Sequence, residues 1–326
     1  MTGSPWISAH LFYHQDPRPL LTHCVRPLIT ELRAAQSIER YFFVRYWQGG
    51  PHIRLRILPT RQASREALQR MLEQRADSFF ANHPAIRPVQ DEVYAQRAAL
   101  FSEFEYGVSE KSPLYPNNSL HYIPYIPETT RYGGVAALPT VEQHFMESSE
   151  ISLELLQQDR TRNQWTGQAL SMMLVGMLQY TNALPIVTSM FESYFFWAHR
   201  VFGPQRASSL EQFEQRYLKQ EQQLQRLITR LLETRVAELS VANDFLADWS
   251  CSIRMLTQAL RSLARQGDLP DDFWAQAPAP RTSLRFGSLP GVILSCLHMH
   301  NNRLGVSLFE EAYLTFLVFR TLKRLQ

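Results

Sequence analysis

The stretch RYFFVRYWQGGPHIRLRI, residues 40–57, decides the fold of the first third of the chain. The range 38–47 is aromatic and β-branched, which favours a strand. Gly49, Gly50 and Pro51 then predict a turn, and residues 52–58 alternate strictly between polar and apolar side chains. Two strands joined by a glycine-containing turn predict a β-hairpin.

The alternation gives the second strand of this hairpin two unlike faces. The apolar face carries Ile53, Leu55 and Ile57. The basic face carries His52, Arg54 and Arg56. Like charges two residues apart on one face repel each other unless an anion or a carboxylate lies between them. Spacing alone leaves two interpretations open, a solvated strand face with structural salt bridges or a binding site for an anionic group.

Outward from the hairpin, the chain mixes strands and helices before it becomes helical. Expected strands cover 6–13 and 121–126, and expected helices cover 20–35, with a bend at Pro27, and 61–82. Residues 107–120 form a turn-rich loop. After residue 138 helical spacing covers 141–158, 164–182, 186–202, 210–239, 242–266, 292–300 and 306–325, with a Pro-rich loop at 275–290. Ser208, three residues before Glu211, predicts a capping box.

This order of elements predicts an α+β fold. We expect a single domain over residues 1–326, with a mixed strand and helix lobe at 1–138 and a mainly helical lobe at 139–326. The 326 residues are 45% hydrophobic, which is enough apolar material for a sizeable core.

The charge balance excludes some partners. The formal net charge of +3 is too small to predict direct nucleic-acid binding. Only three of the 33 basic residues are lysines, a bias that fits either an anionic ligand or genomic composition. The cysteines, Cys24, Cys251 and Cys296, are far apart and are expected to be buried in a reducing compartment. Without a signal peptide or a bilayer-spanning run, the chain is expected to be cytoplasmic, with no membrane partner.

Two further motifs carry candidate chemistry. In PETTRYGG, Glu128 and Arg131 lie three residues apart in a turn that ends in two glycines, so Glu128 could orient Arg131 or Arg54, or form an ordinary local ion pair. In LHMHNNRLG, His298 and Asn301 share a face if the segment is helical, whereas His300 does not. His298 could cap a helix or transfer protons. No third ligand or known metal motif accompanies it, so no metal site is predicted.

Four blocks together resemble the lantibiotic dehydratase C-terminal domain, also called the thiopeptide-type bacteriocin biosynthesis domain. They are WISAHLFYH, the stretch at 40–57, PETTRYGG, and HMHNNRLGV followed by FEEAYL. The resemblance runs from about Trp6 to Leu325. Full-length members transfer glutamate from glutamyl-tRNA to Ser or Thr of a precursor peptide in one half and eliminate it in the other. From its length, this chain is expected to hold only the elimination half, as in the stand-alone proteins of split dehydratases.

The resemblance implies a lyase that forms dehydroalanine or dehydrobutyrine during thiopeptide or lanthipeptide antibiotic biosynthesis, without cofactor or metal. Matched motif by motif, the implied catalytic residues are Arg54, Arg56, Glu128, Arg131 and His298. His52, Asn301 and Arg303 are expected to bind substrate. His298 is the member of the catalytic set with an ordinary pKa near neutrality, so we expect it to move the proton, as base or as acid.

Two alternatives on the same fold stay open. Pyridine synthases join two dehydroalanines in a formal [4+2] cycloaddition and expel the leader peptide, and they generally lack this residue set. A non-catalytic leader-peptide-binding subunit is the other. The expected partners are a modified precursor peptide and a separate glutamyl-tRNA-dependent glutamylating protein, and the oligomeric state is left open.

Overall fold

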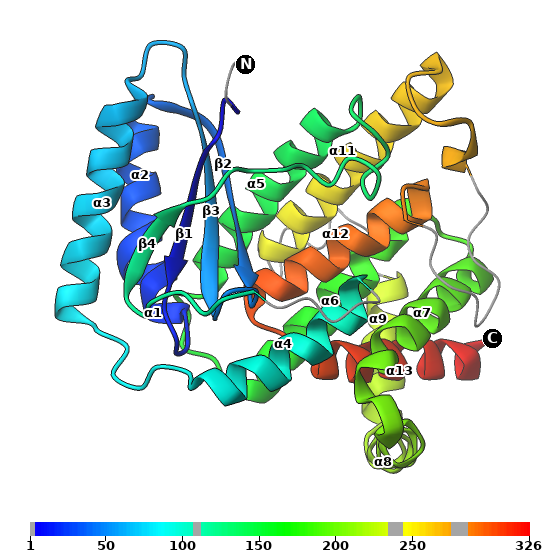
Figure 1. Cartoon of the computed structure of the whole chain (residues 1–326). Helices are drawn as coiled ribbons and strands as arrows, with labels where there is room; N and C mark the ends of the chain where they lie inside the picture. The colour runs from blue at the N-terminus through cyan, green and yellow to red at the C-terminus, as the bar shows by residue number, and fades with distance from the viewer. Residues whose placement is uncertain (1–3, 107–111, 234–243, 275–285) are drawn as a thin grey trace. The chain divides into compact units, whose positions relative to one another are not determined.

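A computed structural model describes residues 4–106, 112–233, 244–274 and 286–326 (Figure 1). The chain divides into two compact units. Unit one comprises residues 1–127 and 152–158, and unit two comprises residues 128–151 and 159–326. A small sheet lies in unit one and unit two is built of helices, so the α+β prediction is confirmed.

Unit one contains a four-stranded antiparallel sheet in the order β2-β3-β1-β4. Its strands are β1 (Ile7–Phe12), β2 (Ile38–Tyr46), β3 (His52–Pro59) and β4 (Ser119–Tyr122). The predicted β2–β3 hairpin is confirmed. The strand expected at 121–126 is wrong in its bounds, because the pairing with β1 begins at Ser119 and stops before Pro124, which has no N–H to donate.

The apolar face of this sheet packs against helices. Ile53, Leu55 and Ile57 are at most 1% exposed. On the same face, the Tyr122 hydroxyl donates to the backbone carbonyl of Gln69 on α3 (Arg65–Asn82). Helix α2 (Arg26–Ala34) lies beside α3 (Figure 1). These helices and the sheet form the core of unit one.

Helical segments in unit one differ from expectation in detail. The segment expected at 20–35 consists of α1 (Arg18–Leu20), a π-helical turn (Leu21–Val25) and α2, with Pro27 in the first turn of α2. Helix α3 begins after Ser64, whose hydroxyl accepts from the Ala67 N–H, so the helix starts later than the expected residue 61. Helix α4 (Asp91–Tyr106) had not been predicted.

Unit two contains most of the helices. They are α5 (Leu138–Leu155, which ends in unit one), α6 (Arg162–Tyr180), α7 (Leu184–Ala198), the 3-10 helix η2 (His199–Gln205), α8 (Arg206–Leu218), α9 (Glu221–Glu233), α11 (Asp244–Gln266), the 3-10 helix η3 (Asp271–Trp274), α12 (Leu289–Leu304) and α13 (Leu308–Leu325). The prediction of one helix at 210–239 is wrong, because α8 and α9 are separate, and 234–239 lies outside the described residues.

The capping box expected at Ser208 is also wrong. Helix α8 begins at Arg206, and the Ser208 hydroxyl donates to the Gln205 carbonyl within the first turn. Capping boxes occur instead at Thr161 with Gln164 and at Ser307 with Glu310. The second of these fixes the start of α13, which carries part of the site described below.

Close packing holds α12 in place. Helices α6 and α11 pack together and both contact α12. A Cβ at Gly176 of α6 would lie 2.7 Å from Leu297 and 2.9 Å from Trp249. The lack of a side chain at Gly176 therefore allows α6 to approach α12 and α11 closely. The Trp249 indole donates to the Met172 carbonyl at 2.7 Å.

Cys24 and Cys296 are buried, as expected. Cys251 is exposed, so its predicted burial is wrong, because α11 turns Trp249 and Ile253 inward instead. No helix in the described part of the chain combines the length and the apolarity needed to cross a bilayer.

Candidate functional site

The basic face of β3 brings Arg54 together with aromatic and polar groups of unit one. The Arg54 guanidinium carbon lies 3.4 Å from the centre of the Tyr46 ring. Its Nε–H donates to His52 Nε2 at 3.3 Å, and its Nη2 lies 3.5 Å from Gln48 Oε1. Stacking on an aromatic ring and two polar contacts hold the guanidinium in one orientation.

Arg56 is the more deeply buried arginine, with 5% of its surface exposed. Its guanidinium carbon lies 5.3 Å from the centre of the Tyr125 ring. Its Nη1 has no hydrogen-bond partner among the described residues. Burial, with a contribution from Arg54, lowers the pKa of Arg56 to about 9. A buried cation beside another cation favours an anion, so this position is suited to a carboxylate.

Histidines complete the basic face. His10 of β1 lies opposite Arg54, and its ring stacks on that of His52 at 4.9 Å. Both rings are buried, and burial lowers the pKa of His10 to about 2 and that of His52 to about 3. The interpretation of a solvated strand face is therefore wrong for His52 and Arg56. The face is a buried, polar and basic surface.

The turn at 128–134 belongs to unit two, where it docks on α12. Arg131 pairs with Glu128 at 3.6 Å, as predicted, but Glu128 is 63% exposed and the pair adds little stability. The Arg131 Nε–H donates to Ser295 Oγ at 3.3 Å, and its guanidinium lies 4.8 Å from the Phe286 ring centre. Gly287 adopts φ +82° and donates its N–H to the Arg131 carbonyl, which ties the turn to the start of α12.

His298 forms a hydrogen-bonded pair with a buried carboxylate. Its Nδ1 lies 2.7 Å from Oε2 of Glu311 on α13, which is 1% exposed. Because an ionised carboxylate only accepts, Nδ1 carries the proton and Nε2 is the nitrogen that can exchange one. His298 is 23% exposed, and its Nε2 makes no hydrogen bond within the described ranges. The Trp197 ring packs edge-on against it at 5.2 Å.

Two neutral donors hold Glu311 in turn. Asn301 Nδ2 donates to Oε1 at 2.8 Å, and the Tyr194 hydroxyl donates to the same oxygen. Burial and Glu311 raise the pKa of Tyr194 well above its ordinary value, so it stays protonated and remains a donor. The carboxylate is thus fixed by α7, α12 and α13 together.

The α12 register agrees with the predicted helical spacing. His298 and Asn301 both reach Glu311, whereas His300 points elsewhere, with Nδ1 2.9 Å from Ser148 Oγ. Ser295, which holds Arg131, lies one turn before His298 on the same face. Arg131 and His298 therefore belong to one cluster in unit two.

Arg303, for which substrate binding is predicted, is a buried residue of α12. It has no exposed surface, and its guanidinium donates to Ser149 Oγ at 3.0 Å and Ser148 Oγ at 3.3 Å. These hydrogen bonds join α12 to α5, and the contact of Arg303 with substrate stays a prediction.

Glu311 and Tyr194 are the site residues that sequence reasoning missed. Glu311 stands inside the block FEEAYL, but an acidic residue in the first turn of a helix is usually a solvated partner of the helix dipole. The spacing of α13 could have identified Glu311, which lies on the same buried helix face as Ala312, Thr315 and Phe316. A carboxylate on a buried face is usually paired with another polar group.

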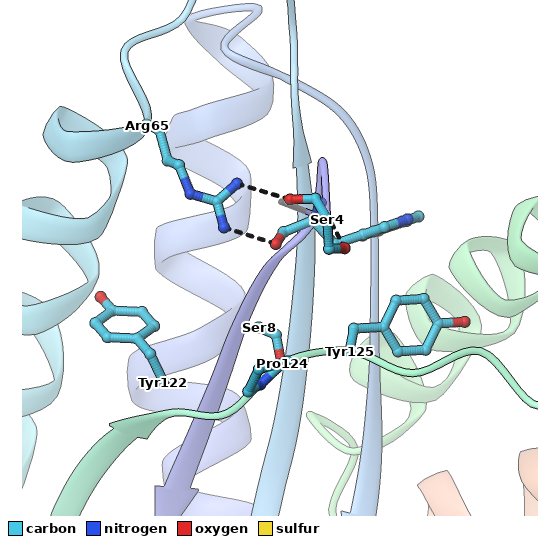
Figure 2. Close-up of a pocket in the computed structure, with 7 residues that line it drawn as sticks. Ser4, Ser8, Arg65, Tyr122, Pro124 and Tyr125 are labelled. Carbon is cyan, nitrogen blue, oxygen red and sulfur yellow. Dashed lines mark hydrogen bonds between the residues drawn. The ribbon is translucent and has the colours of Figure 1, made fainter. Parts of the chain in front are cut away.

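A cavity of about 420 Å³ lies elsewhere in unit one (Figure 2). Its lining is Ser4, Trp6, Ser8, Arg65, Tyr122, Pro124 and Tyr125. Arg65, its one cation, donates to the backbone carbonyls of residues 4–6 at 2.8 to 3.3 Å. The cavity contains none of the predicted site residues, and its charged group already serves to hold the N-terminal segment.

The family model for the C-terminal part of lantibiotic biosynthesis dehydratases matches residues 6–322. The chain belongs to this family. Among curated relatives, epidermin biosynthesis protein EpiB of Staphylococcus epidermidis is 24% identical over 157 residues. That match covers 47% of this chain and only 12% of EpiB, so the chain spans a small part of that relative.

Solved structures share the fold of this family member. TbtD, a pyridine synthase from thiomuracin biosynthesis, superposes with a TM-score of 0.79 at 16% identity over 98% of each chain. The tRNA-dependent lantibiotic dehydratase MibB from Microbispora sp. 107891 gives 0.65 at 18% identity, covering 99% of this chain and 28% of MibB. TsrL gives 0.67 at 19% identity, covering 98% and 94%. At these identities the likeness shows the fold alone.

Proposed function

We propose that this chain removes glutamate from Ser- or Thr-glutamylated precursor peptides by β-elimination, leaving dehydroalanine or dehydrobutyrine. The observation that carries the proposal is the 2.7 Å contact between His298 Nδ1 and the buried Glu311. It fixes a histidine with Nε2 as its exchangeable nitrogen, at the position that the family motif assigns to elimination. Membership of the dehydratase family supports a biosynthetic enzyme of this type.

The reaction needs one base and several fixed cations. His298 Nε2 takes the α-proton of the glutamylated residue, the Cα–H electron pair forms the Cα=Cβ bond, and the Cβ–O bond breaks. Glutamate leaves with the bonding pair as a carboxylate. With its proton on Nδ1, facing Glu311, His298 has a lone pair on Nε2. This arrangement supports the role of base over that of acid.

Cations supply the electrostatic part of the mechanism. Negative charge develops on the carbonyl next to Cα, and a fixed guanidinium such as Arg131, held by Ser295 and Glu128, can stabilise it. In this proposal Arg54 and Arg56 bind the free carboxylate of the glutamyl group. Asn301 acts through Glu311 in this proposal, and the partners are the precursor peptide and a separate glutamylating protein.

Pyridine synthesis is the second candidate. The likeness to TbtD covers 98% of both chains and has a higher TM-score than the likeness to MibB. The basic face of β3 favours elimination over this candidate, because a cycloaddition of two dehydroalanines brings no carboxylate leaving group to a pair of arginines.

Incubation of the purified protein with a Ser-glutamylated precursor peptide tests the proposal. We expect stoichiometric free glutamate and a peptide of the mass of the dehydro product. A peptide carrying two pre-formed dehydroalanines is the parallel substrate. Macrocycle formation with leader release from it, together with an unchanged glutamylated peptide, would replace elimination with pyridine synthesis.

A further inference from the structure

His52 uses both of its ring nitrogens inside unit one. Its Nδ1 lies 2.8 Å from the Gly50 carbonyl oxygen. A carbonyl only accepts, so Nδ1 carries the proton, and Nε2 of the neutral ring is an acceptor. Arg54 Nε–H donates to that Nε2 at 3.3 Å. The two contacts form a chain from the turn carbonyl through the imidazole to the guanidinium.

The surroundings keep this ring neutral and in place. His52 is 3% exposed, with Phe12 at 4.4 Å and His10 at 4.9 Å between ring centres. Burial is the main reason that the pKa of His52 falls to about 3, and the neighbouring Arg54 and Arg56 lower it further. At neutral pH the lone pair on Nε2 therefore remains available to Arg54.

The glycine turn fixes the carbonyl that sets the tautomer. Gly50 adopts φ +110°, and a Cβ there would lie 2.8 Å from Leu114 and 2.9 Å from His14 Nε2. A residue with a side chain would be strained at this φ and would displace Leu114 or His14. The carbonyl of Gly50 is thereby held facing Nδ1, so the turn and the two strand residues act as one structural device.

We infer that His52 is a positioning residue for Arg54: the Gly50 carbonyl sets its tautomer, and its Nε2 holds the guanidinium in place against Tyr46. This inference rests on the proposed function, in which Arg54 binds a carboxylate of the glutamyl group. It replaces the expected direct contact of His52 with substrate. The Nε–H group of Arg54 is occupied by His52, and Nη2 lies 3.5 Å from Gln48 Oε1.

Two matched substitutions separate this role from simple packing. In His52→Gln the amide oxygen reaches the position of Nε2 and can accept from Arg54. In His52→Asn the amide nitrogen reaches the position of Nδ1 and donates to Gly50, but the Arg54 Nε–H group loses its acceptor at His52. We expect His52→Gln to keep the KM for glutamylated peptide within about threefold of wild type, and His52→Asn to raise it roughly tenfold or more, with a smaller change in kcat.

A double substitution and a spectroscopic measurement complete the test. In an Arg54→Ala background, His52→Asn should have no further effect on KM; an undiminished effect, or equal KM values for the Gln and Asn variants, would overturn the inference. Melting temperatures check that both variants fold. The exchange rate of the Arg54 Nε–H proton, measured by NMR, should be slow in wild type and His52→Gln and fast in His52→Asn.

The NMR arm separates two failures. Wild-type protein that releases no glutamate contradicts the proposed function. The same exchange rate in all three proteins contradicts the positioning role, whatever the activity.

Discussion

The basic face of β3 and the His298 cluster are polar in different ways. In unit two, His298 meets a buried carboxylate, and neutral donors from Asn301 and Tyr194 satisfy that carboxylate. In unit one, Arg56 is buried beside another arginine, with Nη1 unpartnered among the described residues. In unit two the histidine has a carboxylate partner, whereas the groups that act on the charge of Arg56 are a second arginine and Tyr125, with no carboxylate among them in the described part of the chain.

The difference fits the two tasks that we propose for these regions. A self-contained histidine–carboxylate pair keeps its geometry without ligand, as proton transfer requires. A buried surface with excess positive charge is costly in the free protein, and a bound anion offsets that cost. The charge bias toward arginine is therefore informative at β3, where planar groups stack on Tyr46 and Tyr125.

The substitution expected to change the elimination rate most is at His298, the base that we propose in unit two. His298→Ala should lower the single-turnover elimination rate by roughly 10²–10⁴-fold, the usual contribution of a positioned base. Binding of glutamylated peptide should stay close to wild type, because the arginines are untouched.

His300→Ala is the matched control for this change. Its ring stacks on Trp249 at 4.1 Å inside unit two, so its loss should lower the melting temperature and leave the rate of the folded enzyme nearly unchanged. An inactive His300→Ala beside an active His298→Ala would assign the proton to the other histidine.

A smaller effect is expected from Glu311→Gln. The amide oxygen would accept from Tyr194 and Asn301, which leaves the amide N–H group facing His298 Nδ1. His298 would then turn to the tautomer with the proton on Nε2, which cannot accept one. We expect a loss of roughly 10²-fold in elimination rate, the lower end of what a positioned base contributes, with ¹⁵N chemical shifts of His298 reporting the tautomer. Glu310→Gln, which preserves the capping box, is the control.

Local patterns predicted the β2–β3 hairpin and the shared helix face of His298 and Asn301. The alternation at 52–58 gave both faces of β3, and helical spacing placed His298 and Asn301 together. These features depend on residues close together in the sequence, so one sequence is enough to predict them. The break between α8 and α9 at Lys219 and Gln220 carries no Gly or Pro, and the sequence therefore looks continuous there.

Partners far apart in the chain could not be predicted in the same way. Glu311 meets Tyr194 across 117 residues, and only the packing of α7 against α13 brings them together. Burial of His52 and Arg56 likewise depends on what covers the second face of the sheet, which alternation does not reveal. Features set by neighbours in the sequence were predictable, whereas contacts between residues far apart in the chain were not.

A smaller change in KM is expected from a substitution of Arg56 on the basic face of β3. Arg56→Lys keeps a cation but loses the planar group over Tyr125, so at pH 6 we expect KM to rise about three- to tenfold. Burial that lowers the pKa of Arg56 to about 9 will also lower the pKa of the introduced ammonium, whose ordinary pKa is lower than that of arginine. A basic group loses its charge as pH rises through its pKa. The KM of the variant should therefore rise further between pH 6 and pH 8.5, while that of wild type should not.

Arg45→Lys is the control. Arg45 lies opposite Ile53 in the β2–β3 register, on the other face of the sheet, and burial also lowers its pKa, to about 10. If both lysine variants show the same pH-dependent KM, the effect belongs to folding of the sheet; if only Arg56→Lys does, the cation on the basic face binds the anionic substrate.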